Sequence, residues 1–341
     1  MHSGVTYPGP VTSTPRPARP VRRGLFVSLF AIAGVVLAAC SSTSSGTGKG
    51  PSSNGQSSSS SSAASSGAHR SSKPPVPTKP VHLSLLQGDG VTYGVGEPII
   101  VTFSVKPTDA KPFVHAVKVT VNGQPADGAW YFERPYADVA MEAHYRLRDY
   151  WPAHAHIHVD LPVKGVSAGP GLAYDDSLTL DMLIGDQHIS TVDGGSLRMN
   201  VRSNGALVKT MKVSLGAAAT PTYNGIKVVM EKKNPQRMIG DGRTPSSTYD
   251  ELVPWSVRVT RSGEFIHAAA WNGGNIGIRS TSNGCTNLNV ADAQWFYKFS
   301  VYGDVVTYQN TTGGQMPALD GLGDWNVAWS QWQAGGQLAT S

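Results

Sequence analysis

A histidine and a cysteine in the last third of the chain have the side chains of a nucleophilic pair. His267 ends a strand-like run, and Cys285 follows eighteen residues later, after a loop rich in Gly and Asn. A thiol is a weak nucleophile until it ionises, and a neighbouring imidazole can take its proton. Gly284 lets the backbone approach closely, and the N–H groups around Gly284 and Cys285 could hold an oxyanion. The chemistry indicated is acyl transfer through a thioester, although this spacing alone also arises by chance.

The only other cysteine, Cys40, ends an export signal. Arginines in residues 16–23 precede an apolar run, 24–39, which is too short to span a bilayer comfortably. The run closes on Leu37-Ala38-Ala39-Cys40, which resembles a bacterial lipobox. We therefore expect residues 1–39 to be a signal peptide and Cys40 to be acylated, and a single-pass N-terminal anchor is the alternative. The first interpretation predicts a lipid-anchored protein on the extracytoplasmic face of the cell membrane.

Lipid attachment at Cys40 would leave Cys285 as a lone thiol outside the cytoplasm. An acylated Cys40 cannot also form a disulfide, and an unpaired thiol in an oxidising compartment is open to oxidation. Catalysis is the common reason to keep such a thiol. A buried structural cysteine is the alternative, but residues 283–287 are polar and turn-like.

The composition favours a β-rich extracellular protein. The 341 residues are 40% hydrophobic and only 15% charged, with abundant Gly, Ser and Pro. The net charge of +5 falls to +1 once the four arginines before Cys40 are removed, so a basic surface for nucleic acid is not expected. Residues 40–80 are mostly Ser and end in Pro, which predicts a disordered linker with a reach of roughly 35 Å.

A first folded domain is expected over residues 81–184. Short alternating runs are separated by turn signals, which favours an immunoglobulin-like β-sandwich. The clearest runs are 99–105, 116–121, 129–132, 142–147 and 178–184. His154, His156 and His158 alternate along another run, so they could share one strand face and bind a metal or sense pH. An ordinary solvated strand face is the alternative.

A second β-rich domain is expected over residues 185–315. Asn204-Gly205 predicts a hairpin turn between two alternating runs, 197–201 and 207–213. Further strands are expected at 225–230, 255–259, 264–267 and 304–308. One short helix should begin after Asn289, which can cap it.

Residues 316–341 form a Trp-rich C-terminal extension. Trp325, Trp329 and Trp332 have the spacing of one helical face. Packing onto the catalytic domain is the favoured role, and stacking against sugars is the alternative.

Residues 187–308 resemble the catalytic domain of bacterial L,D-transpeptidases, which make 3→3 cross-links in peptidoglycan. The distance from His267 to Cys285 agrees with the mycobacterial and actinobacterial branch, which also carries immunoglobulin-like domains. The matching stretches are Ser262-Gly263-Glu264-Phe265-Ile266-His267-Ala268-Ala269, Ser282-Asn283-Gly284-Cys285-Thr286-Asn287-Leu288, Trp295-Phe296-Tyr297, Gly303-Asp304-Val305-Val306 and, in the first domain, Tyr150-Trp151-Pro152-Ala153 with Val159-Asp160.

The resemblance implies roles for single residues. Cys285 would be the nucleophile and His267 the base, with Gly284 beside them in the catalytic loop. Cys285 would attack a tetrapeptide donor stem at its bond to terminal D-Ala, and the side-chain amine of a second stem would accept the acyl group. Positions that match the family's substrate contacts are Tyr249, Met238, Ser262, Gly263, Ser282, Asn283 and Asn287. No cofactor and no metal are expected for the reaction.

Two residues depart from the family pattern. Asn283 replaces the His that usually precedes the Gly-Cys pair, and Ala268 replaces the Ser that often follows the catalytic His. Asn283 can still form hydrogen bonds, and a backbone carbonyl can orient His267. We expect these changes to alter the rate and the carbapenem sensitivity rather than the type of reaction.

The resemblance thus predicts an acyltransferase of peptidoglycan biosynthesis and cell-wall biogenesis, acting on donor and acceptor stem peptides as a monomer. An L,D-carboxypeptidase that cuts the same bond with water is one alternative. A wall-binding scaffold without activity is the other.

Overall fold

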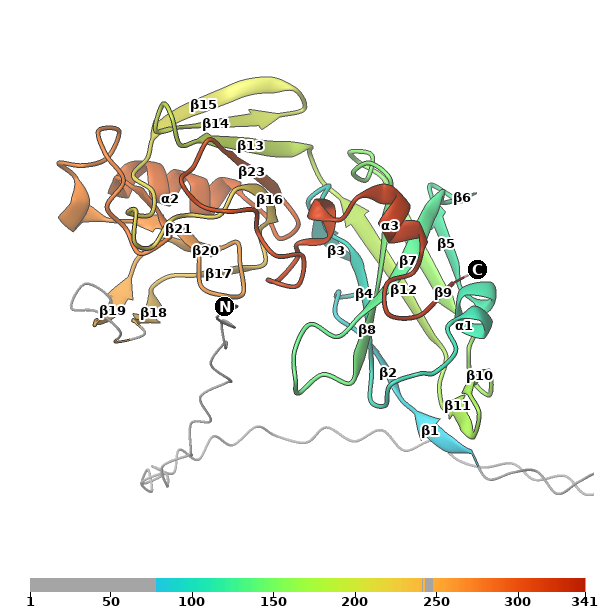
Figure 1. The fold of residues 1–341 in the computed structure, drawn as a ribbon. Coiled ribbons are helices and arrows are strands. Elements are labelled where there is room, and N and C mark those ends of the chain that lie inside the picture. The colour runs from blue at the N-terminus through green and yellow to red at the C-terminus, as the bar shows by residue number, and fades with distance from the viewer. Residues whose placement is uncertain (1–77, 241, 243–247, 341) are drawn as a thin grey trace, which may run out of the picture. The chain divides into compact units, whose positions relative to one another are not determined.

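The computed structural model describes residues 78–240, 242 and 248–340. The predicted signal peptide, Cys40 and nearly all of the predicted linker therefore lie outside the described residues. Strands dominate the described chain, which confirms the predicted mainly β fold (Figure 1). No helix within the described ranges is long and apolar enough to cross a membrane.

The N-terminal half is a β-sandwich, as the alternating runs predict. One sheet has the strand order β2-β4-β8-β7, a second has the order β3-β12-β9-β5-β6, and a small third sheet has the order β1-β11-β10. The elements of this half are β1 (Lys79–Val81), β2 (Leu83–Leu85), β3 (Val91–Tyr93), β4 (Ile99–Phe103), α1 (Lys111–Ala116), β5 (Lys118–Val121), β6 (Gln124–Pro125), β7 (Gly128–Glu133), β8 (Met141–Leu147), β9 (His156–Leu161), β10 (Ser167–Gly169), β11 (Leu172–Tyr174) and β12 (Leu178–Ile184).

Alternation along each strand separates the sandwich core from solvent. In β12, Leu180, Met182 and Ile184 are buried and the residues between them are more exposed. The core also holds a group of aromatic rings around Phe113 of α1, whose centroids lie 5.2–5.9 Å from it. The short helix α1 was not predicted from the sequence.

The predicted face of three histidines is only partly present. His154 precedes β9 in a left-handed conformation (φ 61°), so it does not share the strand face. His156 and His158 do share it; His156 is exposed and His158 half-buried, with a ring nitrogen 3.0 and 2.8 Å, respectively, from Asp181 Oδ1. This arrangement agrees with the alternative of a solvated strand face.

The C-terminal half consists of two sheets and a hairpin. One sheet has the order β15-β14-β13-β23-β16, the other has the order β17-β20-β21-β22, and β18 and β19 form a two-stranded sheet. The elements are β13 (His188–Asp193), β14 (Arg198–Ser203), β15 (Ala206–Lys212), β16 (Gly225–Val228), β17 (Glu231–Lys233), β18 (Gln236–Ile239), β19 (Asp250–Val253), β20 (Ser256–Arg258), β21 (Phe265–Ala268), the 3₁₀ turn η2 (Ala270–Asn272), β22 (Thr286–Leu288), α2 (Val290–Phe299) and β23 (Val305–Gln309).

Local sequence accounts for two connections of this half. Asn204 and Gly205 take positive φ angles (48° and 83°), as a tight hairpin between β14 and β15 requires. The Asn289 side chain accepts a hydrogen bond from the Asp292 N–H at 2.9 Å, so it caps α2 as predicted. Helix α2 packs on β20 and β21 and buries Phe296.

The C-terminal extension differs from its prediction in two ways. Its tryptophans do not share one helix, because Trp325 lies in the 3₁₀ turn η3 (Asp324–Asn326) and the short helix α3 (Trp329–Gln333) begins only at Trp329. Moreover, Trp332 packs on the sandwich: its ring stacks on Tyr131 at 4.7 Å. The predicted packing onto the catalytic half holds for Trp325, which clusters with Val228 and Met230, whereas the surface that Trp332 contacts lies about 200 residues earlier in the chain.

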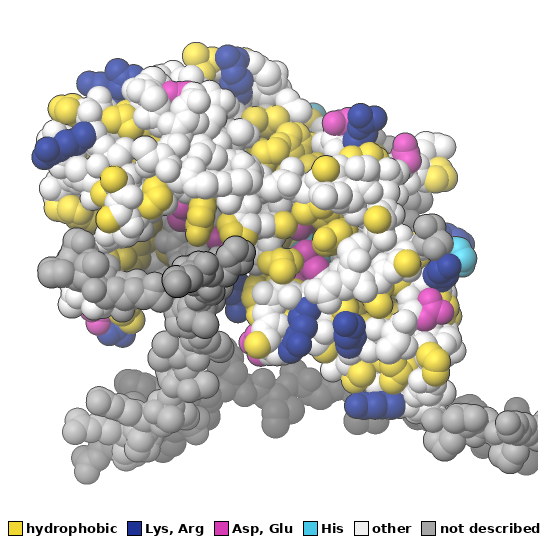
Figure 2. Space-filling model, in the orientation of Figure 1, with side chains coloured by type: hydrophobic (Ala, Val, Ile, Leu, Met, Phe, Trp, Pro, Cys, Tyr) yellow, Lys and Arg dark blue, Asp and Glu magenta, His cyan; other side chains and the backbone are white. Residues whose placement is uncertain are grey.

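The extension also contacts the catalytic half through polar groups. Asn326 exchanges hydrogen bonds with the backbone N–H and C=O of Ile226 at 2.8 and 2.7 Å. The carboxylate of Asp320 accepts two hydrogen bonds from Ser262. The space-filling view shows hydrophobic, basic and acidic side chains interspersed on one face (Figure 2).

Candidate active site

Parallel pairing of two short strands brings His267 and Cys285 together. In β21 and β22, Ile266 lies opposite Thr286 and His267 lies opposite Asn287. Cys285 immediately precedes β22, so the thiol enters at the end of the strand pair beside the imidazole. The residues between His267 and Cys285 therefore form the crossover connection between two parallel strands.

The His267 imidazole is buried and has one defined tautomer. Its Nδ1 lies 2.8 Å from the Ala268 carbonyl oxygen, and because a carbonyl only accepts, Nδ1 carries the hydrogen. The lone pair is then on Nε2. Burial lowers the pKa of His267 to about 4, despite the opposing effect of the Ala268 carbonyl. The ring is thus a neutral base at pH 7, oriented by a backbone carbonyl.

The Cys285 thiol is also buried, although the polar, turn-like sequence around it did not indicate a core. It is 8% exposed and donates to the Gly263 carbonyl oxygen at 3.6 Å. Burial is the largest influence on the thiol and raises the pKa of Cys285 to about 11. The resting pair is therefore a neutral thiol beside a neutral imidazole.

The loop that carries the thiol is held by hydrogen bonds on both sides of it. Thr222 Oγ1 donates to the Gly284 carbonyl at 2.7 Å, and Ser282 Oγ donates to the Cys285 carbonyl at 2.6 Å. Gly284 has φ +108°, a conformation that a side chain would strain. In a planar trans peptide the N–H of Cys285 points opposite to the Gly284 carbonyl, so Thr222 also fixes the direction of that N–H.

A hairpin covers the thiol from the other side. Strands β18 and β19 pair with Met238 opposite Glu251. Met238, Val253 and Phe265 form a small hydrophobic cluster with Cys285, and Tyr249 packs against it. This apolar cover is what removes water from the sulfur and raises its pKa.

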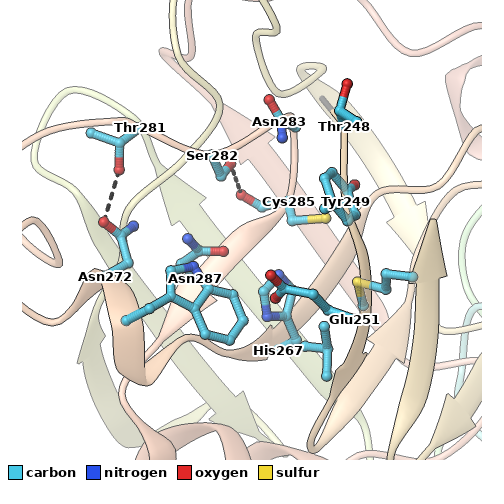
Figure 3. A pocket seen from close by; sticks show the side chains of 13 residues that line it. Thr248, Tyr249, Glu251, His267, Asn272, Thr281, Ser282, Asn283, Cys285 and Asn287 are labelled. Atoms are coloured by element: carbon cyan, nitrogen blue, oxygen red, sulfur yellow. Dashed lines mark hydrogen bonds between the residues drawn. The ribbon is translucent and has the colours of Figure 1, made fainter. Parts of the chain in front are cut away.

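The reacting side chains line a cavity of about 400 Å³. In Figure 3, Cys285 lies above His267, with Tyr249 and Glu251 toward the hairpin and Asn287 on the opposite side. The full lining consists of Met238, Thr248, Tyr249, Glu251, Val253, His267, Trp271, Asn272, Thr281, Ser282, Asn283, Cys285 and Asn287.

Seven of the predicted site residues meet in this cavity. They are Cys285, His267, Tyr249, Met238, Ser282, Asn283 and Asn287. Gly284 belongs to the backbone of the same loop. Gly263 faces the sulfur only through its carbonyl, and Ser262 does not line the cavity because both its N–H and its hydroxyl bond Asp320 at 2.6 Å. Ser262 is therefore placed as a turn residue.

Asn287 presents an unused acceptor to the cavity. The residue is 3% exposed, and its Oδ1 has no hydrogen-bond partner among the described residues. A buried amide oxygen without a partner is costly unless a ligand supplies the donor. Asn287 can therefore accept a hydrogen bond from an N–H of a bound molecule.

Several lining residues were not predicted. Glu251 adds a carboxylate from the exposed side of β19, and Trp271 stacks on His267 with centroids 5.9 Å apart. Asn272 and Thr281 form a 3.0 Å hydrogen bond that braces the connection between β21 and β22. A polar residue in an alternating strand looks like any solvated position, so Glu251 carried no sequence signal.

A buried ion pair lies beneath the cysteine loop. Lys227 Nζ bonds Glu264 Oε2, and Lys227 is fully buried. The second carboxylate oxygen accepts from the Tyr223 N–H at 2.8 Å, and a Cβ at Gly284 would lie 3.7 Å from Glu264 Cγ. Burial lowers the pKa of Lys227 and raises that of Glu264, and each charge offsets the shift of the other. This pair supports the loop from behind.

Family comparisons agree with the two halves of the fold. Residues 187–307 match the L,D-transpeptidase catalytic domain, and residues 53–167 match the bacterial Ig domain. Among curated proteins, the chain is 36% identical over 271 residues to L,D-transpeptidase 2 of Mycobacterium tuberculosis, covering 77% of this chain and 64% of the relative. It is 31% identical over 263 residues to L,D-transpeptidase 5 of the same species, covering 75% and 56%. The chain thus spans less than two thirds of either relative.

Solved structures show the same fold. LD transpeptidase LdtMt1 in complex with imipenem matches with a TM-score of 0.56 and 25% identity, covering 69% of this chain and 100% of that one. An L,D-transpeptidase from Mycobacterium tuberculosis H37Rv matches with a TM-score of 0.52 and 26% identity, covering 66% and 96%.

Proposed function

This chain is a homologue of the mycobacterial L,D-transpeptidases, with an Ig-like domain followed by an L,D-transpeptidase catalytic domain, and we propose that it is itself a cysteine L,D-transpeptidase. The reaction would join two peptidoglycan stems through a 3→3 cross-link and release D-Ala from a tetrapeptide donor. The observation that carries this proposal is the cavity in which the buried Cys285 thiol lies beside the neutral, oriented imidazole of His267.

The first half of the reaction transfers the acyl group to sulfur. Cys285 Sγ attacks the donor carbonyl while His267 Nε2 takes the thiol proton, so the pair becomes charged only as the new S–C bond forms. The N–H of Cys285, whose direction Thr222 fixes, is the nearest candidate donor to the oxyanion. His267 then protonates the departing amine of D-Ala, and a thioester remains.

The second half returns the enzyme to its resting state. The amine of the acceptor stem attacks the thioester carbonyl, His267 takes a proton from that amine, and the thiolate leaves and is reprotonated. Glu251 on the cavity wall would attract the cationic acceptor amine before it loses its proton. Asn287 Oδ1 would accept a backbone N–H of a stem peptide.

Acylation by imipenem tests the nucleophile. We expect the folded chain to gain the mass of one imipenem molecule, and the Cys285→Ala variant to gain none. LdtMt1 has been solved with imipenem bound, which makes this β-lactam a suitable probe. A folded chain that never forms the adduct would support the scaffold alternative.

Product analysis then separates transfer from hydrolysis. Tetrapeptide stems should give cross-linked dimers and free D-Ala when a stem with a free side-chain amine is present. Tripeptide and D-Ala without dimers, even at high acceptor concentration, would identify an L,D-carboxypeptidase instead.

We also infer that Cys40 carries a lipid and holds the protein on the outer face of the cell membrane. The support is the apolar run that ends in Leu37-Ala38-Ala39-Cys40. In cells, the chain should fractionate with membranes, and Cys40→Ala should abolish lipid labelling. A Cys40→Ala chain that still incorporates labelled fatty acid would exclude this attachment site.

A further inference from the structure

A second cluster of charged side chains lies at the sandwich, among residues that the proposed reaction does not use. Glu133 of β7 and His144 of β8 come from adjacent strands, and Asp324 comes from η3 of the C-terminal extension. All three side chains are 3% exposed or less. One ligand atom from each lies within 4.8 Å of the other two.

The two ring nitrogens of His144 have different surroundings. Nδ1 lies 3.1 Å from Asp324 Oδ1, and Nε2 lies 3.1 Å from Glu142 Oε2. Glu133 Oε1 is 3.7 Å from Nε2, too far for a hydrogen bond, and it accepts none from the described residues. Glu133 Oε1 is therefore a buried carboxylate oxygen that faces the Nε2 side of the imidazole and has no donor among the described residues.

In this cluster the carboxyl groups outnumber the basic side chain that pairs with them, because His144 lies beside Glu133, Glu142 and Asp324. Glu97, which is also buried, has one carboxyl oxygen without a hydrogen-bond partner among the described residues and interacts electrostatically with Asp324 and His144. The Arg146 guanidinium, which interacts electrostatically with Asp324, donates its hydrogen bonds to the backbone carbonyls of Leu147, Arg148 and Val327. Buried carboxylates normally require a paired or coordinated cation.

We propose that Glu133, His144 and Asp324 bind a divalent cation of the zinc class. His144 would ligate through one ring nitrogen, with one oxygen each from Glu133 and Asp324, and a water would fill the fourth position of a tetrahedral site. The other ring nitrogen would donate its hydrogen to a neighbouring carboxylate, an arrangement that orients imidazole ligands of metal ions.

The surroundings allow an ion to enter and give its binding a structural role. His144, Glu142 and Glu97 line a cavity of about 550 Å³, which supplies a path for the ion and its water. Because Asp324 belongs to the extension and the other ligands belong to β7 and β8, the ion would fasten the extension to the sandwich. This role is independent of the reaction at Cys285.

Zinc binding by the full chain tests the proposal. After treatment with a chelator and dialysis, titration calorimetry with ZnCl₂ should show one bound equivalent, and zinc should raise the midpoint of thermal unfolding. The isosteric Glu133→Gln should weaken binding by at least about 100-fold, because one charged ligand is lost, while thermal unfolding in the absence of metal confirms that it folds. Should Glu133→Gln fail to fold, Asp324→Asn takes its place.

Two controls exclude other zinc ligands. Asp181→Asn disrupts the surface group of Asp181, His156 and His158, and Cys285→Ala removes the buried thiol. Both variants should still bind one equivalent of zinc. The proposal is overturned if the folded chain binds no zinc at 100-fold molar excess, if Glu133→Gln binds as the parent does, or if either control loses the equivalent.

Discussion

At the scale of single residues, burial sets the chemistry of the proposed site. The thiol and the imidazole are both shielded from water, which disfavours the charged form of each. A preformed thiolate–imidazolium pair would react with small electrophiles already near neutral pH. The geometry here indicates a neutral pair that separates charge only when a substrate carbonyl is in place.

Alkylation of Cys285 should therefore become steadily faster at high pH. With the pKa of Cys285 raised to about 11, the thiolate fraction increases about tenfold per pH unit from pH 7 to 10. Intact mass after timed exposure to iodoacetamide gives the rate, and Cys285→Ala should remain unlabelled at this position. A rate that is already constant between pH 6 and 8 would show that the resting thiol is ionised.

Loss of the lysine beneath the loop should be costly. In Lys227→Met the Glu264 carboxylate stays buried without its cation, which destabilises folded proteins by about 3–5 kcal/mol. Adding Glu264→Gln should recover much of that loss, because the amide oxygen can still accept from the Tyr223 N–H without carrying a charge. Urea unfolding of the single and double variants measures both effects. If Lys227→Met is as stable as the parent, the ion pair contributes nothing to the free energy of unfolding.

At the scale of elements, the sequence predicted what is local. Alternation located most strands, Asn204-Gly205 located a hairpin, and the capping Asn289 located the start of α2. Contacts between residues that are far apart in the sequence could not be predicted from it. In the sequence Lys227 looks like an ordinary strand residue, because its partner Glu264 is 37 positions away. Likewise, Asp324 contacts His144 across 180 positions of the chain.

The residues of the candidate site were likewise predicted correctly only in part. His267, Cys285 and the hairpin residues Met238 and Tyr249 occupy the cavity that the family resemblance indicated. Ser262 does not, because Asp320 of the extension binds its hydroxyl and its N–H. A sequence pattern can predict a turn, but it does not show which distant segment will form hydrogen bonds with the residues of that turn.

The C-terminal extension should depend mainly on one tryptophan. Trp332 is fully buried, donates from Nε1 to the Ala129 carbonyl at 2.8 Å and lies beside the Arg146 guanidinium. Trp332→Ala should lower the free energy of unfolding by about 3–5 kcal/mol. Trp329→Ala, which removes a half-buried ring from the same guanidinium, should cost only about 1 kcal/mol. Similar costs for the two variants, measured in urea, would contradict this account.

At the scale of the molecule, the sandwich and the catalytic half are joined by backbone contact. The Gly94 N–H donates to the Tyr302 carbonyl at 2.7 Å, and the Gly96 N–H donates to the Gly303 carbonyl at 2.8 Å. Val305 of β23 packs in the sandwich core, while Tyr308 of the same strand bonds Thr286 beside the catalytic loop at 2.8 Å. One strand thus connects the sandwich to the site, and the two halves should unfold in one cooperative transition.

Substituting Gly94 tests this junction directly. A Cβ at this position would lie 2.4 Å from the Asp304 nitrogen and 2.5 Å from the Gly303 carbonyl carbon, so backbone must move to admit it. Gly94→Ala should destabilise the folded chain by at least about 2 kcal/mol and broaden or split the urea transition. Gly314→Ala is the matched control, because its Cβ would meet nothing within 4 Å, and it should stay within about 0.5 kcal/mol of the parent. If both variants unfold like the parent, the contact between the halves does not couple their folding; if only Gly94→Ala separates the transitions, the sandwich is part of what stabilises the catalytic half.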